Sequence, residues 1–322
     1  MRKLILILSI FIAILFTSCS NTLSIQNSAP IYAMDTIIDI TFYNTDNYKE
    51  HYKKIKKIYQ DVDTVANDFS SSYNEISIYD LNQKREIQGN DILIDLINKS
   101  LELKDETNGY YNPFIGRLSH LWKVAIKNNE IVSKDLINQE LEIMNNTKVE
   151  INNNTIKLTG EGNLDLGGIA KGYATQKAYE YLKENNITKY IINAGNSNIV
   201  FGNKNGKNFK VSFESPNDNS SYYLFEGKDK IISTSSHKYQ HIIIDGKVYH
   251  HLLNPFTGIC ENYYDSVNVF CDNNMYADAY STAFFVMDID TIKSFIESKN
   301  IDVILYKDNN ILLNTLDGDK NE

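Results

Sequence analysis

Residues 163–178 read NLDLGGIAKGYATQKA, and this stretch decides how the chain folds around its centre. A short apolar run that contains Asp165 leads to the adjacent glycines Gly167 and Gly168, and a segment that carries Lys171 follows. The N-terminus of a helix presents unpaired N–H groups, and a residue without a Cβ lets a ligand approach the main chain closely. The glycine pair therefore indicates either a ligand-binding turn or a tight turn that serves packing alone.

The segment after the glycines has the periodicity of an amphipathic helix that ends near Asn185 and Asn186. Its small and apolar side chains fall on or beside one face: Ile169, Ala170, Tyr173, Ala174, Ala178 and Leu182. Its polar side chains are predicted on the rest of the surface: Lys171, Thr175, Gln176, Lys183 and Glu184. Neither the phosphate-binding Gly-Lys-Ser/Thr loop nor the dinucleotide pattern GxGxxG is present, so this helix alone identifies no ligand.

Outward from this helix, alternating apolar residues predict strands and helical spacing predicts helices. Strands are predicted over 34–43 and 188–195, and hairpins over 147–160, 241–252 and 301–316. Helices are predicted over 48–67, over 91–107 with Asp91 as the N-cap, and over 276–287. Because several hairpins are mixed with helices, we expect an α+β fold of mixed sheets with packed helices rather than a doubly wound sheet.

The composition is that of a globular protein, with 42% hydrophobic and 23% charged residues among 322. The formal net charge is −9, and no basic stripe is visible in the sequence. An acidic surface repels the phosphates of nucleic acids. Nucleic-acid binding is therefore not expected.

The first residues, MRKLILILSIFIAILFTSCSN, have the form of an export signal. The apolar run after the two basic residues is shorter than the ~20 residues of a spanning helix. Its end resembles a bacterial lipoprotein signal, so we expect a signal peptide over 1–18, a lipid on Cys19 and a polar tether over 19–30. An ordinary cleaved signal and an uncleaved anchor are the alternatives. Each of the three places the folded part, a single domain over 31–315, outside the cytoplasm and, with the lipid, on the membrane.

Removal of the signal peptide and lipidation of Cys19 leave Cys260 and Cys271 as the remaining cysteines. Outside the cytoplasm these two residues could form one disulfide, or both could be free buried thiols. Their spacing does not indicate a metal site.

Asp278 and Thr282 lie four residues apart in a predicted helix that is otherwise mostly apolar. This spacing places a carboxylate and a hydroxyl on one face of the helix. Both are hard oxygen ligands of the kind that Mg²⁺ uses together with substrate phosphates. The alternative is that Asp278 caps the helix while Thr282 donates back to a main-chain carbonyl.

Two histidines, His250 and His251, end the hairpin predicted over 241–252, just before the turn sequence NPFTG. Histidine is the usual general base near neutral pH, so one of the two is a candidate base. A histidine on a strand can equally be structural. The serine-rich stretches 70–73 and 233–237 offer hydroxyls for phosphate binding, or are solvated loops.

Together and in this order, these segments resemble the ApbE family of FAD:protein FMN transferases over roughly residues 30 to 310. The resemblance rests on MDT at 34–36, NEI at 74–76, YYNPFIGRLSHLW at 110–122, NLDLGGIAKGYA at 163–174, NAG at 193–195, TSS at 234–236, HLLNPFTG at 251–258 and ADAYSTAFF at 277–285. It implies a T-fold-related architecture with a central FAD cleft. It further implies an extracytoplasmic enzyme that splits FAD with Mg²⁺, transfers FMN to a threonine hydroxyl of a membrane-associated redox protein and releases AMP.

Carried over position by position, the resemblance assigns the metal to Asp278, Thr282 and the main-chain carbonyl of Gly168. It makes His251 the base that activates the acceptor hydroxyl. The expected FAD contacts are Met34, Ser72, Asn112, Asp165 and Lys171. Lys171 would offset phosphate charge as a point cation.

The chain departs from the family pattern at four of these motif positions. The family usually has aspartate where Asn112 and Asn254 stand, and often glycine where Asn196 and Ser236 stand. These changes leave the proposed metal ligands and base in place. Two other functions remain open: an FAD pyrophosphatase that yields FMN and AMP, and a lipid-anchored flavin-binding protein without turnover.

Overall fold

The computed structural model describes residues 23–71 and 76–316. The predicted signal peptide, the lipidation site Cys19 and the candidate FAD contact Ser72 lie outside these residues.

A nine-stranded antiparallel sheet forms the centre of the fold, in the order β1-β3-β7-β8-β11-β14-β15-β16, with β2 also paired to β3. Its strands are β1 (Ile25–Asn27), β2 (Ile31–Ala33), β3 (Thr36–Tyr43), β7 (Tyr190–Ala194), β8 (Asn198–Phe201), β11 (Lys230–Ser236), β14 (Ser266–Phe270), β15 (Asp302–Lys307) and β16 (Asn310–Asn314). Since every strand pair in it is antiparallel, the predicted α+β class is confirmed.

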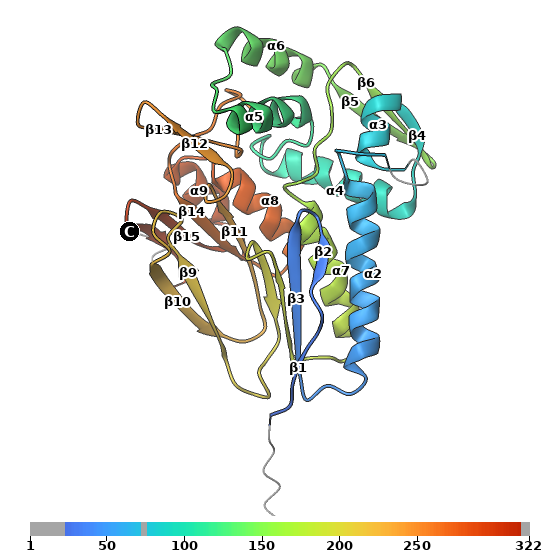
Figure 1. The fold of residues 1–322 in the computed structure, drawn as a ribbon, viewed down its shortest axis with the longest axis vertical. Coiled ribbons are helices and arrows are strands. Elements are labelled where there is room, and N and C mark those ends of the chain that lie inside the picture. Colours follow the sequence, from blue (N-terminus) through green and yellow to red (C-terminus); the bar gives the residue numbers. More distant parts are fainter. Residues whose placement is uncertain (1–22, 72–75, 317–322) are drawn as a thin grey trace, which may run out of the picture.

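One face of this sheet is covered by helices (Figure 1). Helix α8 (Asn274–Phe284) packs against β11 and β14, α7 (Ala170–Glu184) packs beside α8, and α2 (Tyr48–Ala66) lies against α7. The remaining helices are α3 (Ile78–Lys84), α4 (Asp91–Glu106), α5 (Gly116–Asn128), α6 (Lys134–Asn145) and α9 (Ile289–Ile296). The stretch around the glycine pair therefore begins a helix that lies at the centre of the helical layer.

The opposite face of the sheet is covered by a hairpin of β9 (Phe209–Glu214) and β10 (Ser221–Gly227) (Figure 1). A cluster of buried aromatic side chains joins this hairpin to the sheet: Tyr43, Phe201, Phe209, Phe213, Phe225 and Phe270. Alternate residues of β11 serve the two layers, since Ile231 packs toward the helices and Ile232 toward the aromatic cluster.

Two small antiparallel sheets complete the fold: β4 (Glu86–Gln88) with β5 (Lys148–Asn152) and β6 (Thr155–Thr159), and β12 (His241–Ile244) with β13 (Lys247–His250). The hairpins predicted over 147–160 and 241–252 are thereby confirmed. In the second, Asp245 and Gly246 have positive φ values of 51° and 76°, as a two-residue turn of type I′ requires.

The structure contradicts one predicted helix cap, Asp91, and the alternative interpretation of Asp278 as a cap. Helix α4 is capped by Asn90, whose side chain accepts from the N–H of Leu93, and Asp91 is its first helical residue. Helix α8 is capped by Asn273, so Asp278 lies in the middle of the helix and does not cap it. In both helices an asparagine further upstream, Asn90 or Asn273, accepts from the main-chain N–H groups of the first turn, which have no partner within the helix.

Helix α7 is less amphipathic than its sequence predicts, because it is covered on two sides. Thr175 and Gln176, predicted outside the apolar face, are both buried. The Thr175 hydroxyl lies 2.8 Å from the hydroxyl of Tyr59 on α2, and Gln176 accepts from the main chain of Asn274 on α8 at 2.9 Å. Partners on neighbouring helices and on α7 itself satisfy their polar groups.

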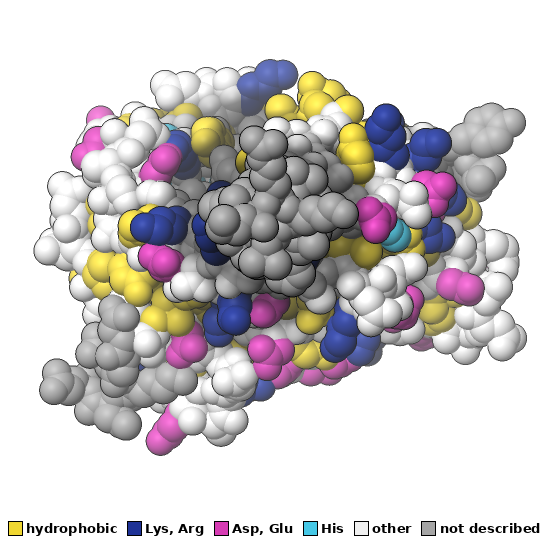
Figure 2. All heavy atoms as spheres, turned by 90° about the horizontal axis from the view of Figure 1, so that it is seen from below, with side chains coloured by type: hydrophobic (Ala, Val, Ile, Leu, Met, Phe, Trp, Pro, Cys, Tyr) yellow, Lys and Arg dark blue, Asp and Glu magenta, His cyan; other side chains and the backbone are white. Residues whose placement is uncertain are grey.

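The surface charges, the helix lengths and the cysteines were also compared with the sequence-based expectations. On the face drawn in Figure 2, basic and acidic side chains are interspersed rather than segregated. Among residues 23–71 and 76–316, no helix combines the length and apolar character needed to cross a membrane. Cys260 and Cys271 are both free thiols.

Candidate active site

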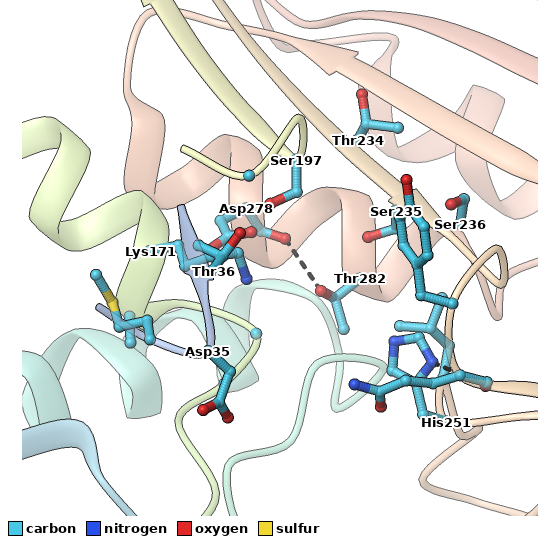
Figure 3. A pocket seen from close by; sticks show the side chains of 18 of the residues that line it. Asp35, Thr36, Lys171, Ser197, Thr234, Ser235, Ser236, His251, Asp278 and Thr282 are labelled. Atoms are coloured by element: carbon cyan, nitrogen blue, oxygen red, sulfur yellow. Dashed lines mark hydrogen bonds between the residues drawn. The ribbon is translucent and has the colours of Figure 1, made fainter. Parts of the chain in front are cut away.

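A cleft of about 1530 Å³ lies between the turn that joins β2 to β3, the end of β11 and the helices α7 and α8. Every candidate site residue that the structure describes lines it: Met34, Asn112, Asp165, Gly168, Lys171, His251, Asp278 and Thr282. Figure 3 shows Asp278 and Thr282 on one helix, with Lys171 and His251 on different sides of the cavity. Segments more than 200 residues apart in the chain therefore meet in one site.

The carboxylate of Asp278 is held by donors from three other elements. Its Oδ2 accepts from the N–H of Gly172 at 2.8 Å, and its Oδ1 accepts from the amide of Asn198 at 3.0 Å. The hydroxyl of Ser233 lies 3.5 Å from the same Oδ1. Sequence reasoning missed Asn198, which belongs to no sequence pattern, whereas Ser233 lies in the serine-rich stretch 233–237. They fix an acidic side chain that is almost fully buried at the base of the cleft.

Two further serine hydroxyls extend this network toward the cleft. The hydroxyl of Ser281 lies 3.2 Å from that of Ser233 and 2.9 Å from that of Ser235. The sequence offers two interpretations of the stretch 233–237, a phosphate-binding run or a solvated loop. The stretch is mostly the end of strand β11 rather than a loop, and Ser235 lines the cleft, so the phosphate-binding interpretation stays a prediction.

The diglycine turn brings the main chain against Thr282. A Cβ on Gly168 would lie 3.2 Å from the Thr282 hydroxyl oxygen and 3.2 Å from the ring of Tyr111. Thr282 itself donates to the carbonyl of Asp278 at 3.1 Å, which is the helical back-bonding expected as one alternative for this residue. That hydroxyl keeps its lone pairs, so back-bonding and a ligand role are compatible.

These oxygen groups fit a hard divalent cation. In the described residues, no group of three or more His, Cys, Asp or Glu side chains is placed to hold a metal. A Mg²⁺ ion, however, is commonly held by one or two carboxylates while substrate phosphates and water complete its shell. The Asp278 carboxylate, the Thr282 hydroxyl and the space beside Gly168 that a Cβ would fill are compatible with this kind of site.

Asp165 forms a second charged cluster on the other side of the glycine turn. Its carboxylate accepts from the hydroxyl of Ser119 at 2.7 Å and from the N–H of Gly167 at 2.8 Å, and the Lys123 ammonium lies 3.5 Å away. Burial alone would raise the pKa of Asp165, but Lys123 and the two hydrogen bonds outweigh it, so the pKa lies below its usual value. Burial and the charge of Asp165 raise the pKa of Asp68 to about 6, against the influence of Lys123.

Met34 lies in a strained turn at the mouth of the cleft. Met34 and Asp35 have φ values of 51° and 54°, and the pairing of Ala33 with Thr36 makes them the two central residues of a type I′ turn. Methionine rarely adopts positive φ. The carboxylate of Asp63 accepts from the Met34 N–H at 2.7 Å and stabilises the turn.

His251 is held at the edge of the cleft by the main chain of Gln240. The main-chain N–H of His251 donates to the Gln240 carbonyl at 3.2 Å, and the ring Nδ1 of His251 lies 3.3 Å from the same carbonyl oxygen. If Nδ1 carries the proton, the lone pair of Nε2 is available to accept another. Burial is the main cause that lowers the pKa of His251 to about 4, and the ring is therefore neutral at pH 7.

The neighbouring His250 is structural. It is fully buried, its Nε2 lies 2.8 Å from the carbonyl of Glu261, and its Nδ1 accepts from the N–H of Leu252 at 3.3 Å. Burial lowers its pKa to about 3. Of the two histidines in the sequence pair, His251 is the one that lines the cleft.

The two Asn-Pro-Phe sequences have the same local structure. The side chain of Asn112 accepts from the N–H of Phe114 at 3.0 Å, and that of Asn254 accepts from the N–H of Phe256 at 2.9 Å. Aspartate could make the same turn, which explains how asparagine substitutes for it here. In addition, the Asn254 amide donates to the carboxylate of Glu261 at 3.0 Å, where an aspartate would be repelled.

The packing of α7 against α8 depends on Gly172. A Cβ there would lie 2.5 Å from the Asn274 carbonyl oxygen and 2.9 Å from the Met275 Cα. We expect Gly172→Ala to destabilise the protein by about 1–3 kcal/mol because the helices must separate. Helix propensity alone predicts the opposite, a gain of about 1 kcal/mol. Urea denaturation distinguishes the two signs, and a more stable variant would contradict the close packing.

Comparison with curated proteins finds relatives named FAD:protein FMN transferase, an enzyme of the transferase class. One, from Treponema pallidum (strain Nichols), is 25% identical over 212 residues, which are 60% of this chain and 59% of the relative's own length. Another, from Klebsiella pneumoniae (strain 342), is 26% identical over 225 residues, covering 64% of this chain and 69% of the relative.

A solved structure and a family model extend the match over most of the chain. The crystal structure of an ApbE protein from Thermotoga maritima superimposes with a TM-score of 0.78 at 22% identity, covering 88% of this chain and 94% of the other. At this identity the likeness shows the fold. The model of the ApbE family matches residues 34–305. The resemblance read from the order of the motifs is thus confirmed, and the chain belongs to the ApbE family.

Proposed function

We propose that this protein transfers FMN from FAD to a threonine hydroxyl of an acceptor protein and releases AMP, with Mg²⁺ as the metal. One observation carries the proposal. A single cleft is lined by a buried carboxylate, Asp278, a main-chain turn without side chains at Gly167 and Gly168, and a neutral imidazole, His251. The names of the relatives support the same activity.

In this proposal Asp278, Thr282 and the carbonyl of Gly168 hold the metal. When bound, Mg²⁺ would offset charge on the phosphoryl oxygens. Lys171 and Asn112 contact FAD. The turn at Met34 and the cluster around Asp165 also contact FAD.

His251 is assigned the proton transfer. The threonine oxygen attacks the phosphorus of the FMN half, the P–O–P linkage breaks, and AMP leaves with the bridging oxygen. The threonine proton passes to Nε2 of His251. Because Nδ1 faces the Gln240 carbonyl, the ring is oriented with Nε2 free for this role.

The proposed activity is tested by incubating the full chain with FAD and Mg²⁺, with and without a candidate threonine-containing acceptor. Transfer predicts AMP together with a covalent, fluorescent flavin on the acceptor. AMP and free FMN without labelling would instead identify a pyrophosphatase. Flavin binding without any AMP would identify a carrier and overturn the proposal.

We also propose that the protein is anchored by a lipid on Cys19 at the extracytoplasmic face of the membrane, where its acceptor would be a membrane-associated redox subunit. The support is the sequence of residues 1–21 alone, with its basic start, apolar run and cysteine. Intact mass measurement of the membrane fraction tests it, with Cys19→Ala as the control. An unmodified Cys19 in the exported protein would contradict the anchor.

A further inference from the structure

A buried histidine outside the cleft lining, His237, contacts a buried carboxylate that the proposed proton transfer does not use. His237 directly follows β11 and Asp265 directly precedes β14, next to the last paired residues of these strands, Ser236 and Ser266. The Nε2 atom of His237 lies 3.2 Å from Oδ1 of Asp265. An ionised carboxylate can only accept, so Nε2 donates in this hydrogen bond.

Asp265 is a charged anchor held from several sides. Its carboxylate also accepts from the Lys307 ammonium at 2.8 Å, the Asn217 amide at 3.1 Å and the main-chain N–H of Asp308 at 3.0 Å. Burial alone would raise the pKa of Asp265, but the hydrogen bonds from His237, Lys307 and the main chain outweigh it, so the pKa lies below its ordinary value. The carboxylate is therefore ionised at neutral pH.

His237 begins the connection 237–240, which joins β11 to the hairpin of β12 and β13. The carbonyl of His237 accepts from Nδ1 of His241, just beyond the other end of the connection, at 2.8 Å. Between these two anchored histidines stands Gln240, whose carbonyl contacts both the main-chain N–H and the ring Nδ1 of His251. The rest of the connection lines the cleft, but His237 does not. His237 can therefore influence the cleft only through the connection that it begins.

The contact with Asp265 is the one polar contact that the His237 ring makes in the described residues. Its other nitrogen, Nδ1, is buried and has no hydrogen-bond partner within residues 23–71 and 76–316. The ring stacks on that of His250, with centroids 5.9 Å apart and planes inclined by 14°. An apolar ring could fill this space without burying an unpaired nitrogen. What it could not supply is the hydrogen bond to Asp265.

We propose that His237 and Asp265 are positioning residues for the base His251, an inference that rests on the proposed function. Their hydrogen bond holds the connection 237–240 in place, so that the Gln240 carbonyl keeps the proton on Nδ1 of His251. Nε2 of His251 then stays unprotonated and free to take the threonine proton. Neither positioning residue touches substrate.

The test compares His237→Phe with wild type on the full chain. Phenylalanine keeps a ring but no donor, and Asp265 keeps its three other donors, so the thermal midpoint without ligand should stay close to that of wild type. The rate of FMN transfer at saturating FAD and acceptor should fall about tenfold or more, while FAD affinity stays within about twofold. The reason is that misplacing a catalytic group by about 1 Å can cost about 100-fold in rate.

A double-mutant cycle separates positioning from a general structural effect. Introduced into His251→Ala, the substitution His237→Phe should change the residual transfer rate by less than about twofold, because the base that it positions is absent. In contrast, His237→Gln places an amide donor near the position of Nε2. This conservative variant should recover most of the wild-type rate.

The tautomer of His251 gives a measurement that needs neither FAD nor an acceptor. NMR of the imidazole nitrogens distinguishes a protonated nitrogen from an unprotonated one, and the signals of His251 are identified by their loss in His251→Ala. We expect a proton on Nδ1 in wild type and a mixture of tautomers in His237→Phe. The control is His51→Phe, since His51 contacts the Tyr181 hydroxyl at 2.9 Å and does not line the cleft. It should leave the tautomer and the transfer rate unchanged.

An unchanged His251 tautomer in His237→Phe, or the same loss of rate with and without the His251 side chain, would overturn the positioning role. Should His237→Phe fail to fold, Asp265→Asn, which keeps the size of the side chain and removes its charge, is judged by the same two measurements. A wild-type protein that transfers no FMN would instead overturn the proposed function. The tautomer would still show whether this network fixes His251, so the two failures are distinguishable.

Discussion

Asp278→Asn is expected to lower AMP release from FAD by at least about 100-fold while the protein stays folded. The charge of one proposed Mg²⁺ ligand is lost, and metal assistance to phosphoryl transfer contributes several kcal/mol. Each 1.4 kcal/mol corresponds to a factor of about ten in rate.

Asparagine is the informative replacement because the hydrogen bonds around position 278 can be kept. The carboxylate accepts from the Gly172 N–H and from the Asn198 amide, whereas an asparagine has only one acceptor oxygen. The Oδ1 atom of Asn198 is buried and has no partner among the described residues. A flip of the Asn198 amide would let this oxygen accept from the side-chain amide introduced at position 278. The variant then differs from wild type mainly in charge.

Alanine is expected to behave differently at the same position. Asp278→Ala leaves the Gly172 N–H and the Asn198 amide buried without an acceptor. Each unsatisfied group costs about 1–3 kcal/mol, so this variant should lose stability as well as metal dependence. The comparison of the two variants by urea denaturation separates the structural role of Asp278 from its charge.

The measurement for Asp278→Asn is the rate of AMP release as a function of Mg²⁺ concentration. A suitable control is Asp95→Asn, since Asp95 accepts from the hydroxyl of Tyr173 and does not line the cleft. The control should keep the wild-type rate and Mg²⁺ dependence. An Asp278→Asn protein with undiminished Mg²⁺ dependence would show that the carboxylate is not a ligand.

Most helices, strands and turns of this chain were predictable, because residues close together in the sequence decide where such elements form. The Asp245–Gly246 turn is an example, since two positive φ values in a row leave few other residue choices. The order of the strands was not predictable in this way. Strand β3 pairs with β7 about 150 residues later, and that pairing depends on packing across the whole domain. The burial of Thr175 was missed for the same reason, because its partner Tyr59 comes from a distant helix.

In the candidate site, too, some residues were predictable from the sequence and others depend on the fold. Gly168, His251 and Asp278 were found because they stand in motifs whose order resembles a family. Asn198 and Lys123 were not, since both stand outside the quoted motifs, although Lys123 directly follows the one at 110–122. Only the fold places the Asn198 amide 3.0 Å from Asp278 and the Lys123 ammonium 3.5 Å from Asp165. The positions that support a site are therefore harder to predict than those that define its motif.

His251→Ala is expected to reduce FMN transfer to the acceptor by about 10²–10⁴-fold and to leave FAD affinity within a few-fold of wild type. This is the range that a positioned general base contributes. The imidazole is held by Gln240 rather than by the other cleft residues, so its removal should not disturb the metal ligands or the glycine turn. The exposed His120, which does not line the cleft, offers the control His120→Ala.

The pH dependence gives this prediction a second, independent measurement. Burial lowers the pKa of His251 to about 4, and a base acts in its deprotonated form. The rate of FMN transfer by the wild-type protein should therefore stay nearly constant from about pH 8 to about pH 5 and fall as the pH drops through about 4. With an exposed histidine as the base, the rate would already fall near about pH 6.5. Because the His251→Ala protein has no imidazole to protonate, its residual rate should lack this limb. A variant that transfers FMN at the normal rate, or that keeps the same acid limb, would remove His251 from the proton transfer.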